Sequence, residues 1–435
     1  ILKPIILYML FDIMCKNLKF FVNKGKRMAL VACYVLFFSI PKLILSLLQI
    51  NFLKQERVKS PYILESNAFL KAADYAIVRE RISVANILVD MLLISFWILF
   101  GLSALDSVLE LSPLVKSVAF VLCFLVVGAL ANLPFEAYQT LVVDKKFGFA
   151  KGGVKLFILD SLKSFGLLLV VGGILILIFS WIILEVQFWE MYVFIFGVVL
   201  IVGVNFLYPI LIAPMFNKFT PLENVELNDK IDALLKCVGF QSKGVFVMDA
   251  SKRDGRLNAY FAGLGRAKRV ILFDTLLNKI PHSSILAVLG HELGHFKHYD
   301  IYKMMVLVLG FFGALLFVVA NLPESLFLSA NVERNVHTLI VFLLLLSAPI
   351  GFYFMLLVNW QSCQNEFAAD KFGASLTSAE SLANALLVLV KENNSFPLAH
   401  PLYMRFFYSH PPLMARLMAL GCENLANCAN KSQEV

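Results

Sequence analysis

The sequence predicts an all-α integral membrane protein with about seven transmembrane helices and one small α/β domain. Two observations lead to this prediction. Hydrophobic residues make up 60% of the 435-residue chain and charged residues only 16%, whereas soluble domains contain roughly 45–50% apolar residues. Apolar segments of about 20 residues, the length that crosses a bilayer, also recur along the chain and are separated by polar loops.

Seven apolar segments are long enough to span a bilayer. They lie near 28–50, 85–105, 114–133, 165–184, 191–213, 304–322 and 338–358. The second contains Asp90, and an acidic residue at that depth is expected to face a cavity or a partner group rather than lipid. Residues 1–27 carry six cationic side chains, which suggests either that Met28 is the native start or that 1–27 is a short helix lying on the membrane surface.

Charges on the loops predict the orientation in the membrane. Basic loops at 51–84 and 134–164 alternate with acidic loops at 106–113 and 185–190. The positive-inside rule therefore places the polar segment 214–303 on the cytoplasmic side, and seven spans place the N-terminus on the other side. The net charge of +8 is explained by these loops. Because no basic run is interleaved with aromatic residues, no nucleic-acid partner is expected.

The spans divide the chain into five predicted parts. These are an N-terminal extension (1–27), a membrane domain of five helices (28–213), a cytoplasmic insert (214–303), two further transmembrane helices (304–358) and a C-terminal helical part (359–435). The seven cysteines are scattered and include no CxxC pair, so they predict neither a disulfide framework nor a cysteine-based zinc site.

Within the insert, the pattern of apolar residues predicts a helix at 223–238, short strands at 244–249 and 268–274, and a helix that begins near Ser283. After the last span, it predicts helices at 363–376 and 379–391. A loop containing prolines follows, and a final helix begins at about Pro412.

An HExxH motif, His291-Glu-Leu-Gly-His295, lies within the helix that begins near Ser283. Histidines four residues apart share one helix face, so both imidazoles can reach a single metal ion, with Glu292 close beside it. Two ligands, a polarised water and a carboxylate are the parts of a zinc hydrolase site. The motif by itself is weak, because an amphipathic helix can carry two histidines without binding a metal.

A catalytic zinc needs a third protein ligand, and Glu366 is the best candidate. Glu366 and Asp370 share a helix face beside the last span, so one can ligate while the other accepts the ring N–H of a zinc histidine. The metzincin position, six residues past His295, is Ile301. His298 lies one turn past the motif and is expected to be a solvated residue at the helix end.

A third polar cluster consists of Tyr408-Ser-His410-Pro-Pro-Leu413 with Arg416 beyond it. A histidine that precedes two prolines is held stiffly, and a donor in that place can stabilise the oxyanion of a tetrahedral intermediate. Taken alone, the cluster is better explained as a plain turn before a helix.

Together these motifs resemble the type I CAAX prenyl proteases, a family of integral-membrane HExxH zinc metalloendopeptidases. HELGH, NEFAAD and SHPPLMAR occur in that order with seven spans, and the stretches 258–263 and 269–277 are similar to the active-site strand region of the family. The resemblance extends from about residue 30 to the C-terminus. It implies that the insert is a small α/β zinc-metalloprotease domain.

By this resemblance, one Zn²⁺ per chain is bound by His291, His295 and Glu366, and Glu292 is the catalytic base. These four positions match the motifs of the family without departure.

The resemblance also implies roles for residues around the metal. His410 and Arg416 are expected to be catalytic, stabilising the oxyanion, and Asp370 is expected to orient a ligand. Asn258 and Tyr260 are expected to bind the substrate.

The implied activity is hydrolysis of peptide bonds in membrane-associated or lipidated CAAX-type proteins. The expected partners are a peptide or protein substrate, lipidated or not, and the lipid bilayer. The active site is expected to face the cytoplasm, in a bacterial inner membrane or the endoplasmic reticulum. Two alternatives remain: a heat-shock-type quality-control metalloprotease, which has fewer spans, and a metal-binding transporter, which requires ionisable residues in several spans.

Overall fold

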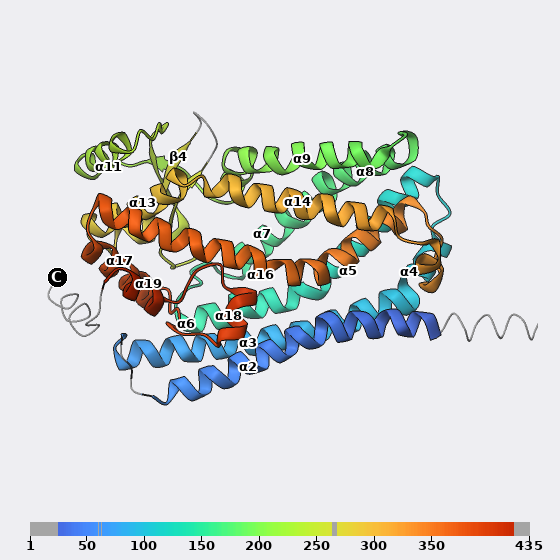
Figure 1. Ribbon diagram of the computed structural model, residues 1–435, viewed down its shortest axis with the longest axis horizontal. Helices are drawn as coiled ribbons and strands as arrows, with labels where there is room; N and C mark the ends of the chain where they lie inside the picture. The colour runs from blue at the N-terminus through green and yellow to red at the C-terminus, as the bar shows by residue number, and fades with distance from the viewer. Residues whose placement is uncertain (1–24, 60, 62, 263–267, 422–435) are drawn as a thin grey trace, which may run out of the picture.

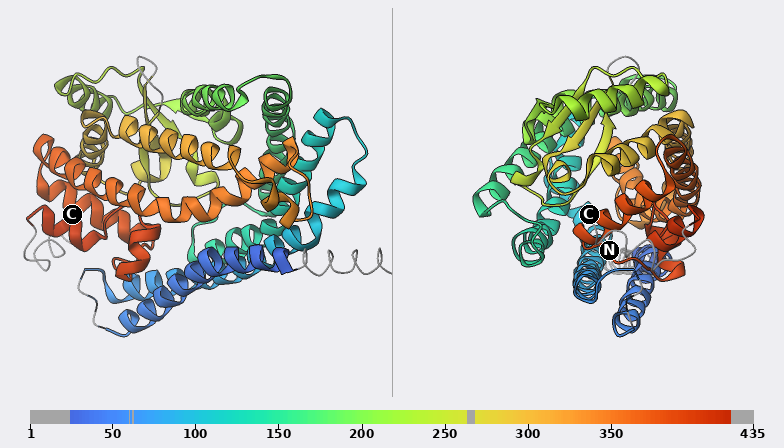
Figure 2. Two further views of the ribbon diagram at one scale, coloured as in Figure 1. Left: turned by 45° about the vertical axis from the view of Figure 1, so that its right-hand side comes forward. Right: turned by 90° about the vertical axis from the view of Figure 1, so that its left-hand side faces the viewer.

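The computed structural model describes residues 25–59, 61, 63–262 and 268–421, which form long helices and one small sheet. The long helices run roughly along the longest axis, whereas the sheet and the C-terminal helices gather at one end (Figures 1 and 2). The predicted fold class is confirmed. The prediction for 1–27 lies outside the described residues, except that 25–27 begin the first long helix.

Within the described residues, six helices are long and apolar enough to cross a membrane. They are Gly25–Arg57, Ser66–Val108, Pro113–Phe147, Val154–Glu185, Asp300–Ala320 and Val336–Leu376. A further apolar helix, Trp189–Asn205, is shorter and lies where the fifth span was predicted. The α-helix α9 (Trp189–Leu207) continues directly into a π-helical turn at Tyr208–Ile212 and a short α-helix, α10 (Ala213–Phe216).

The last membrane helix, α16 (Val336–Leu376), is continuous over 41 residues. The sequence predicted a span that ends near 358 and a separate helix from Cys363, and this division was wrong. Residues 359–362 contain neither glycine nor proline, so nothing ends the helix there. As a result, Glu366 and Asp370 stand on a direct extension of a membrane helix.

The insert contains a four-stranded sheet in the order β1-β2-β4-β3. The strands are β1 (Phe219–Pro221), β2 (Val245–Met248), β3 (Ala259–Ala262) and β4 (Arg269–Phe273). The central pair β2–β4 is parallel and the two outer pairs are antiparallel. The sequence missed β1, which has only three residues and includes a proline. In the described part of the chain, β3 therefore has one edge that pairs with no strand.

Two helices of the insert pack with the sheet in one core. They are α11 (Val225–Cys237) and the motif helix α13 (His282–Lys297), and the fully buried residues of this core include Ile231, Leu272 and Leu289. Two helices after the last span, α17 (Ala379–Glu392) and α19 (Leu413–Ala419), lie beside α13 at the same end of the molecule (Figure 1). Ala385 of α17 belongs to this core too, so the core joins the insert to the C-terminal part.

Charged contacts attach the insert to the membrane helices. Arg253 donates to both carboxylate oxygens of Asp160 on α7 (Val154–Leu167), at 2.8 Å from Nε and 3.0 Å from Nη2. Arg256 lies 3.3 Å from Asp144 and also contacts the hydroxyl of Tyr75. The loop before β3 is therefore held against helices of the N-terminal half.

Replacing Arg253 by alanine is expected to lower the free energy of unfolding by about 1–3 kcal/mol, because two charge-assisted hydrogen bonds are lost. The measurement is the thermal unfolding midpoint in detergent. Lys155→Ala is the control, since Lys155 is an exposed cation on the same helix α7. Equal midpoints for the two variants would contradict this account of the attachment.

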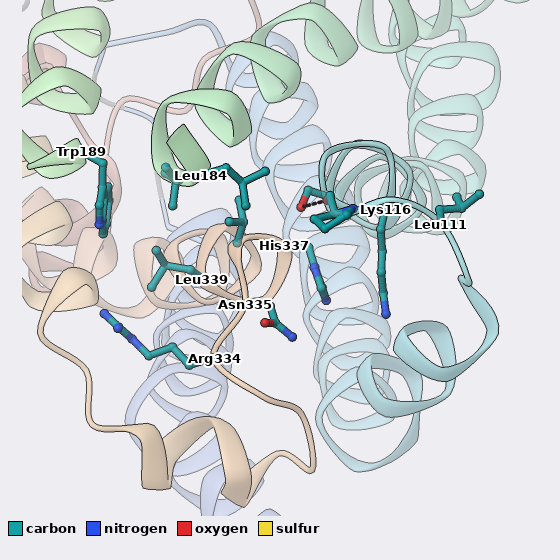
Figure 3. A pocket seen from close by; sticks show the side chains of 12 residues that line it. Leu111, Lys116, Leu184, Trp189, Arg334, Asn335, His337 and Leu339 are labelled. Carbon is teal, nitrogen blue, oxygen red and sulfur yellow. Dashed lines mark hydrogen bonds between the residues drawn. The ribbon is translucent and has the colours of Figure 1, made fainter. Parts of the chain in front are cut away.

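At the far end of the helices from the sheet, a pocket of about 390 Å³ lies between the starts of α5 (Pro113–Tyr138) and α16 and the end of α8 (Gly173–Glu185) (Figure 3). His337 Nε2 and Lys116 Nζ each lie 2.8 Å from Asp106 Oδ1. Lys116 balances the charge of Asp106 and His337 forms a hydrogen bond with the same oxygen, so we regard the cluster as a structural tie between helix ends.

Candidate metal centre

The helices α13 and α16 touch at backbone distance because small residues face each other. A Cβ atom placed on Gly373 would lie 2.6 Å from the backbone N of His291, and one on Gly294 would lie 2.7 Å from the Cα of Ala369. Real Cβ atoms are essentially never found so close to other atoms. The close packing allows His291 and His295 to reach the side chain of Glu366 on the neighbouring helix.

Three ligand-type groups converge between these helices. The Nε2 atoms of His291 and His295 lie 3.2 Å apart, and they lie 3.5 Å and 3.3 Å, respectively, from the carboxylate oxygens of Glu366. Atoms bound at about 2.0–2.1 Å to a tetrahedral zinc are about 3.3–3.4 Å apart. All three measured separations are close to that value, and two imidazoles with one carboxylate are a donor set that suits zinc.

A buried carboxylate oxygen without a hydrogen-bond partner also indicates a metal site. Glu366 Oε2 is buried and accepts no hydrogen bond from the described residues, although Arg416 Nη1 lies 3.4 Å away. A buried carboxylate oxygen without a partner is costly. A cation between the two histidines would remove that cost.

The outer nitrogens of both histidines face carboxylates. His291 Nδ1 lies 2.8 Å from Asp370, and His295 Nδ1 lies 3.0 Å from Asp300. With Nδ1 protonated and donating outward, each Nε2 lone pair points inward to the position of the ion. Burial lowers the pKa of His295, but its bonds to Glu366 and Asp300 raise it to about 9 overall in the metal-free protein. A bound metal must therefore displace a proton.

Asp300 is a site residue that the sequence reasoning missed. It is buried at the first position of α14 (Asp300–Ala320), directly after Tyr299, whose φ of 59° turns the chain sharply. The sequence signal for this role was an acidic residue five positions after His295. Only the turn at Tyr299 brings that acid back onto His295.

Replacing Asp300 by alanine is expected to weaken zinc binding by about 10–100-fold, because His295 loses the carboxylate that fixes its ring. Zinc retention can be measured against a series of chelator concentrations. Lys303→Ala is the matched control: it removes the other partner of Asp300, at 2.9 Å, but leaves the carboxylate in place. An unchanged affinity in Asp300→Ala would refute this role.

Glu292 lies where two cavities meet. One, of about 450 Å³, also contains Tyr260, Lys268 and His295. The other, of about 430 Å³, also contains Asn258, His291, His410 and Arg416. Burial raises the pKa of the Glu292 carboxyl above its usual range, which makes the carboxylate a stronger proton acceptor.

The polar cluster after α18 (Pro401–Phe407) also reaches the site. Arg416 donates to both oxygens of Asp370, from Nε at 2.8 Å and from Nη2 at 2.6 Å. His410 Nε2 lies 3.2 Å from Glu366, and its Nδ1 lies 2.8 Å from Ser409 Oγ. His298, by contrast, caps the C-terminus of α13 and packs against Phe372, and it is not part of the group that could hold a metal.

Comparison with known protein families divides the chain into two parts. Residues 49–218 match the model described as CAAX prenyl protease N-terminal, five membrane helices, and residues 221–423 match peptidase family M48. CAAX prenyl protease 1 of Saccharomyces cerevisiae is 32% identical over 411 residues, which cover 84% of this chain and 89% of the yeast protein. The chain belongs to the CAAX prenyl protease 1 family.

A human relative and a solved structure support the same family assignment. The CAAX prenyl protease 1 homolog of Homo sapiens is 31% identical over 70% of this chain and 73% of the human protein. The crystal structure of S. mikatae Ste24p superposes with a TM-score of 0.78 at 26% identity, covering 92% of this chain and 98% of that one. The protein is therefore a membrane zinc metalloprotease, and neither the heat-shock-type protease nor the transporter is favoured.

Proposed function

We propose that the protein cleaves a peptide bond near the C-terminus of lipidated, CAAX-type protein substrates. One observation carries the proposal: the cavity that holds Glu292 and His295 is also lined by Ile201, Met305 and Val308, which belong to membrane helices. The catalytic carboxylate is therefore adjacent to an apolar wall on which a lipid chain can lie. The names of the relatives support the same substrate class.

His291, His295 and Glu366 are the proposed ligands of one zinc ion, and Glu292 is the proposed base. When bound, zinc supplies a water of lowered pKa and polarises the scissile carbonyl. Glu292 accepts the proton of that water and returns it to the leaving amine.

His410 and Arg416 are the proposed donors to the oxyanion. Asp370 occupies Nε and Nη2 of Arg416, which leaves Nη1 directed towards Glu366 and the ligand group. His410 Nε2 is directed to the same carboxylate. Donors that are held in place before the reaction stabilise developing charge without a cost of reorganisation.

The substrate is proposed to bind as an extended strand along the unpaired edge of β3. Main-chain hydrogen bonds then give affinity with little demand on sequence. Asn258 and Tyr260 lie in the two different cavities at Glu292, so they are proposed to contact the substrate on opposite sides of the scissile bond.

The active site is proposed to face the cytoplasm, in the endoplasmic reticulum membrane. The basic loop 134–164 predicted this side, and residues 144 and 160 within it contact Arg256 and Arg253 of the insert. Labelling of an introduced surface cysteine in the insert by a membrane-impermeant reagent tests the orientation. Labelling in sealed microsomes with cytoplasmic side outward is the expected result, and labelling only after lysis would contradict it.

The decisive experiment compares a farnesylated peptide with the same peptide lacking the lipid, using detergent-purified protein with and without chelator. We expect cleavage of the farnesylated peptide at a higher kcat/KM, and loss of cleavage with chelator. Equal cleavage of both peptides would show that the lipid does not contribute to substrate recognition. Cleavage that persists with chelator would show that the metal is not required.

A further inference from the structure

The segment 393–412, which we call the His410 strap, joins α17 to α19 and carries His410 near its end. Its middle is the short helix α18, which packs between α16 and the membrane helix α2 (Ile40–Arg57) (Figure 1). The neighbour of α2 in the N-terminal half is α3 (Ser66–Phe96). The proposed oxyanion donor therefore follows a helix that is held between distant parts of the chain.

The ring of His410 is not held by packing. Of its side-chain surface, 63% is accessible, and the ring lines the cavity of about 430 Å³. Its polar contacts within the described residues are with Ser409 and Glu366. The backbone that carries the ring must therefore set its position, and that backbone is fixed by anchors on either side of His410.

The anchor after His410 lies on α16. Arg416 of α19 donates to both carboxylate oxygens of Asp370, at 2.8 Å and 2.6 Å. Pro411 and Pro412 stiffen the backbone between His410 and α19. This side of the strap is therefore fixed to the helix that carries Glu366.

The anchor before His410 lies in the N-terminal half. The hydroxyl of Tyr403 donates to Glu80 Oε1 on α3 at 2.5 Å, and the N–H of His400 donates to Gln49 Oε1 on α2 at 2.8 Å. Tyr403 and Gln49 are buried, and a hydrogen bond shielded from water is stronger than an exposed one. Two helices that supply no metal ligand thus hold the strap in front of His410.

The helix α18 connects this anchor to His410. The ring of Tyr403 stacks on Phe407 with centroids 4.5 Å apart and meets Tyr408 edge-on at 5.9 Å. The N–H of Tyr408 donates to the carbonyl of Met404 at 3.0 Å. His410 follows two residues later, so a shift of α18 reaches the histidine through a short stretch of backbone.

We propose that Glu80 is a positioning residue for His410 and acts through the hydroxyl of Tyr403. This inference rests on the proposed function, in which His410 donates to the oxyanion. Glu80 lines neither cavity at Glu292 and is not part of the group that could hold a metal. Loss of the Tyr403–Glu80 bond allows α18 to move away from α3, which shifts His410 Nε2 from the place where it meets the oxyanion.

The first test compares the full-length wild-type protein with Tyr403→Phe and Glu80→Leu, which remove the bond and keep side chains of similar size. Complete loss of one oxyanion donor costs about 10²–10³-fold in kcat, so a displaced donor is expected to cost about tenfold. KM for a farnesylated peptide should stay within about twofold, because the lost interaction belongs to the transition state. Zinc content and the thermal unfolding midpoint show whether each variant is folded.

Glu80→Gln separates the hydrogen bond from the charge. Its amide oxygen still accepts from the Tyr403 hydroxyl, so kcat is expected within about twofold of wild type. Wild-type kcat in the folded variants that lack the bond, or a change confined to KM, would overturn the proposal. So would a fall in Glu80→Gln as large as that in Glu80→Leu.

Tyr353→Phe is the matched control. The hydroxyl of Tyr353 donates to the carbonyl of Phe37 at 2.6 Å, so it also ties α16 to the N-terminal half, but it is not part of the His410 strap. Wild-type kcat is expected. A loss equal to that of Tyr403→Phe would show that any such tie affects the rate, and it would overturn the specific role of Glu80.

A double-mutant cycle tests whether Tyr403 acts through His410. The probe is a phosphinic peptide, whose tetrahedral anionic group resembles the oxyanion intermediate, and its Kd does not depend on turnover. Tyr403→Phe is expected to weaken binding by about fivefold in the wild-type background and by less than about twofold in His410→Ala, because coupled residues are not additive. Equal fold-changes in the two backgrounds would overturn the action through His410.

The outcomes separate the positioning role from the proposed function. A wild-type protein that does not cleave the farnesylated peptide, or cleaves it no better than the peptide without the lipid, overturns the proposed substrate, and the binding cycle still decides the role of Glu80. If His410→Ala binds the phosphinic peptide as tightly as wild type, His410 is not a donor to the oxyanion, and the positioning role is overturned with it.

Discussion

Glu292→Gln is expected to abolish peptide hydrolysis while zinc stays bound. Glutamine has nearly the same shape as glutamate, but it cannot accept the proton of the attacking water, and general-base catalysis contributes about 10²–10⁴-fold. The group of side chains that could hold a metal, His291, His295 and Glu366, does not include Glu292. The rate should therefore fall at least by that factor without loss of the metal.

Two measurements on the same purified sample check this expectation: kcat/KM on a farnesylated peptide, and zinc content by elemental analysis. His291→Ala serves as the contrasting variant, because it should lose both activity and zinc. Activity close to wild type in Glu292→Gln would rule out Glu292 as the base. Loss of zinc in Glu292→Gln would show that its carboxylate helps to hold the metal.

Gly373→Ala is expected to destroy the site from a position that lines neither cavity at Glu292. The added Cβ would lie 2.6 Å from the backbone N of His291, so α13 and α16 must move apart. Glu366 and Asp370 are on α16 and both histidines are on α13, so any separation pulls the ligand set apart. A displacement of about 1 Å can cost about 10²-fold in rate, and zinc affinity should fall with it.

Gly310→Ala is the matched control, because a Cβ at this helical glycine has no atom within 4 Å. Exchanging glycine for alanine within a helix favours the helix by about 0.5–1 kcal/mol. The control should therefore keep zinc and activity and unfold at an equal or higher temperature. If Gly373→Ala behaved in the same way, the backbone contact of α13 with α16 would not determine the geometry of the site.

Much of the centre follows from local sequence. The spacing of His291 and His295 forces both rings onto one helix face, and the same periodicity pairs Glu366 with Asp370. The apolar segments predicted the membrane helices: six helices of the described residues are long and apolar enough to cross a membrane, and α9 lies where the fifth span was predicted. These properties depend on neighbours within a few residues, which a sequence displays directly.

Other features require contacts between distant segments, which no periodicity reveals. The sequence predicted a break after residue 358, although α16 continues through it and carries Glu366 to within 3.5 Å of His291 and 3.3 Å of His295. It did not reveal the turn at Tyr299 that brings Asp300 back to His295, nor the pairing of Asn393 with Leu257 across 136 positions.

The sequence by itself determined the membrane class, the pair of histidines and the acids available to join them, because helix geometry fixes which side chains share a face. Only the tertiary structure decided which carboxylate contacts which imidazole. That choice depends on how closely α13 and α16 pack. Gly294 and Gly373 permit this close packing because a side chain at either position would clash with the backbone of the other helix.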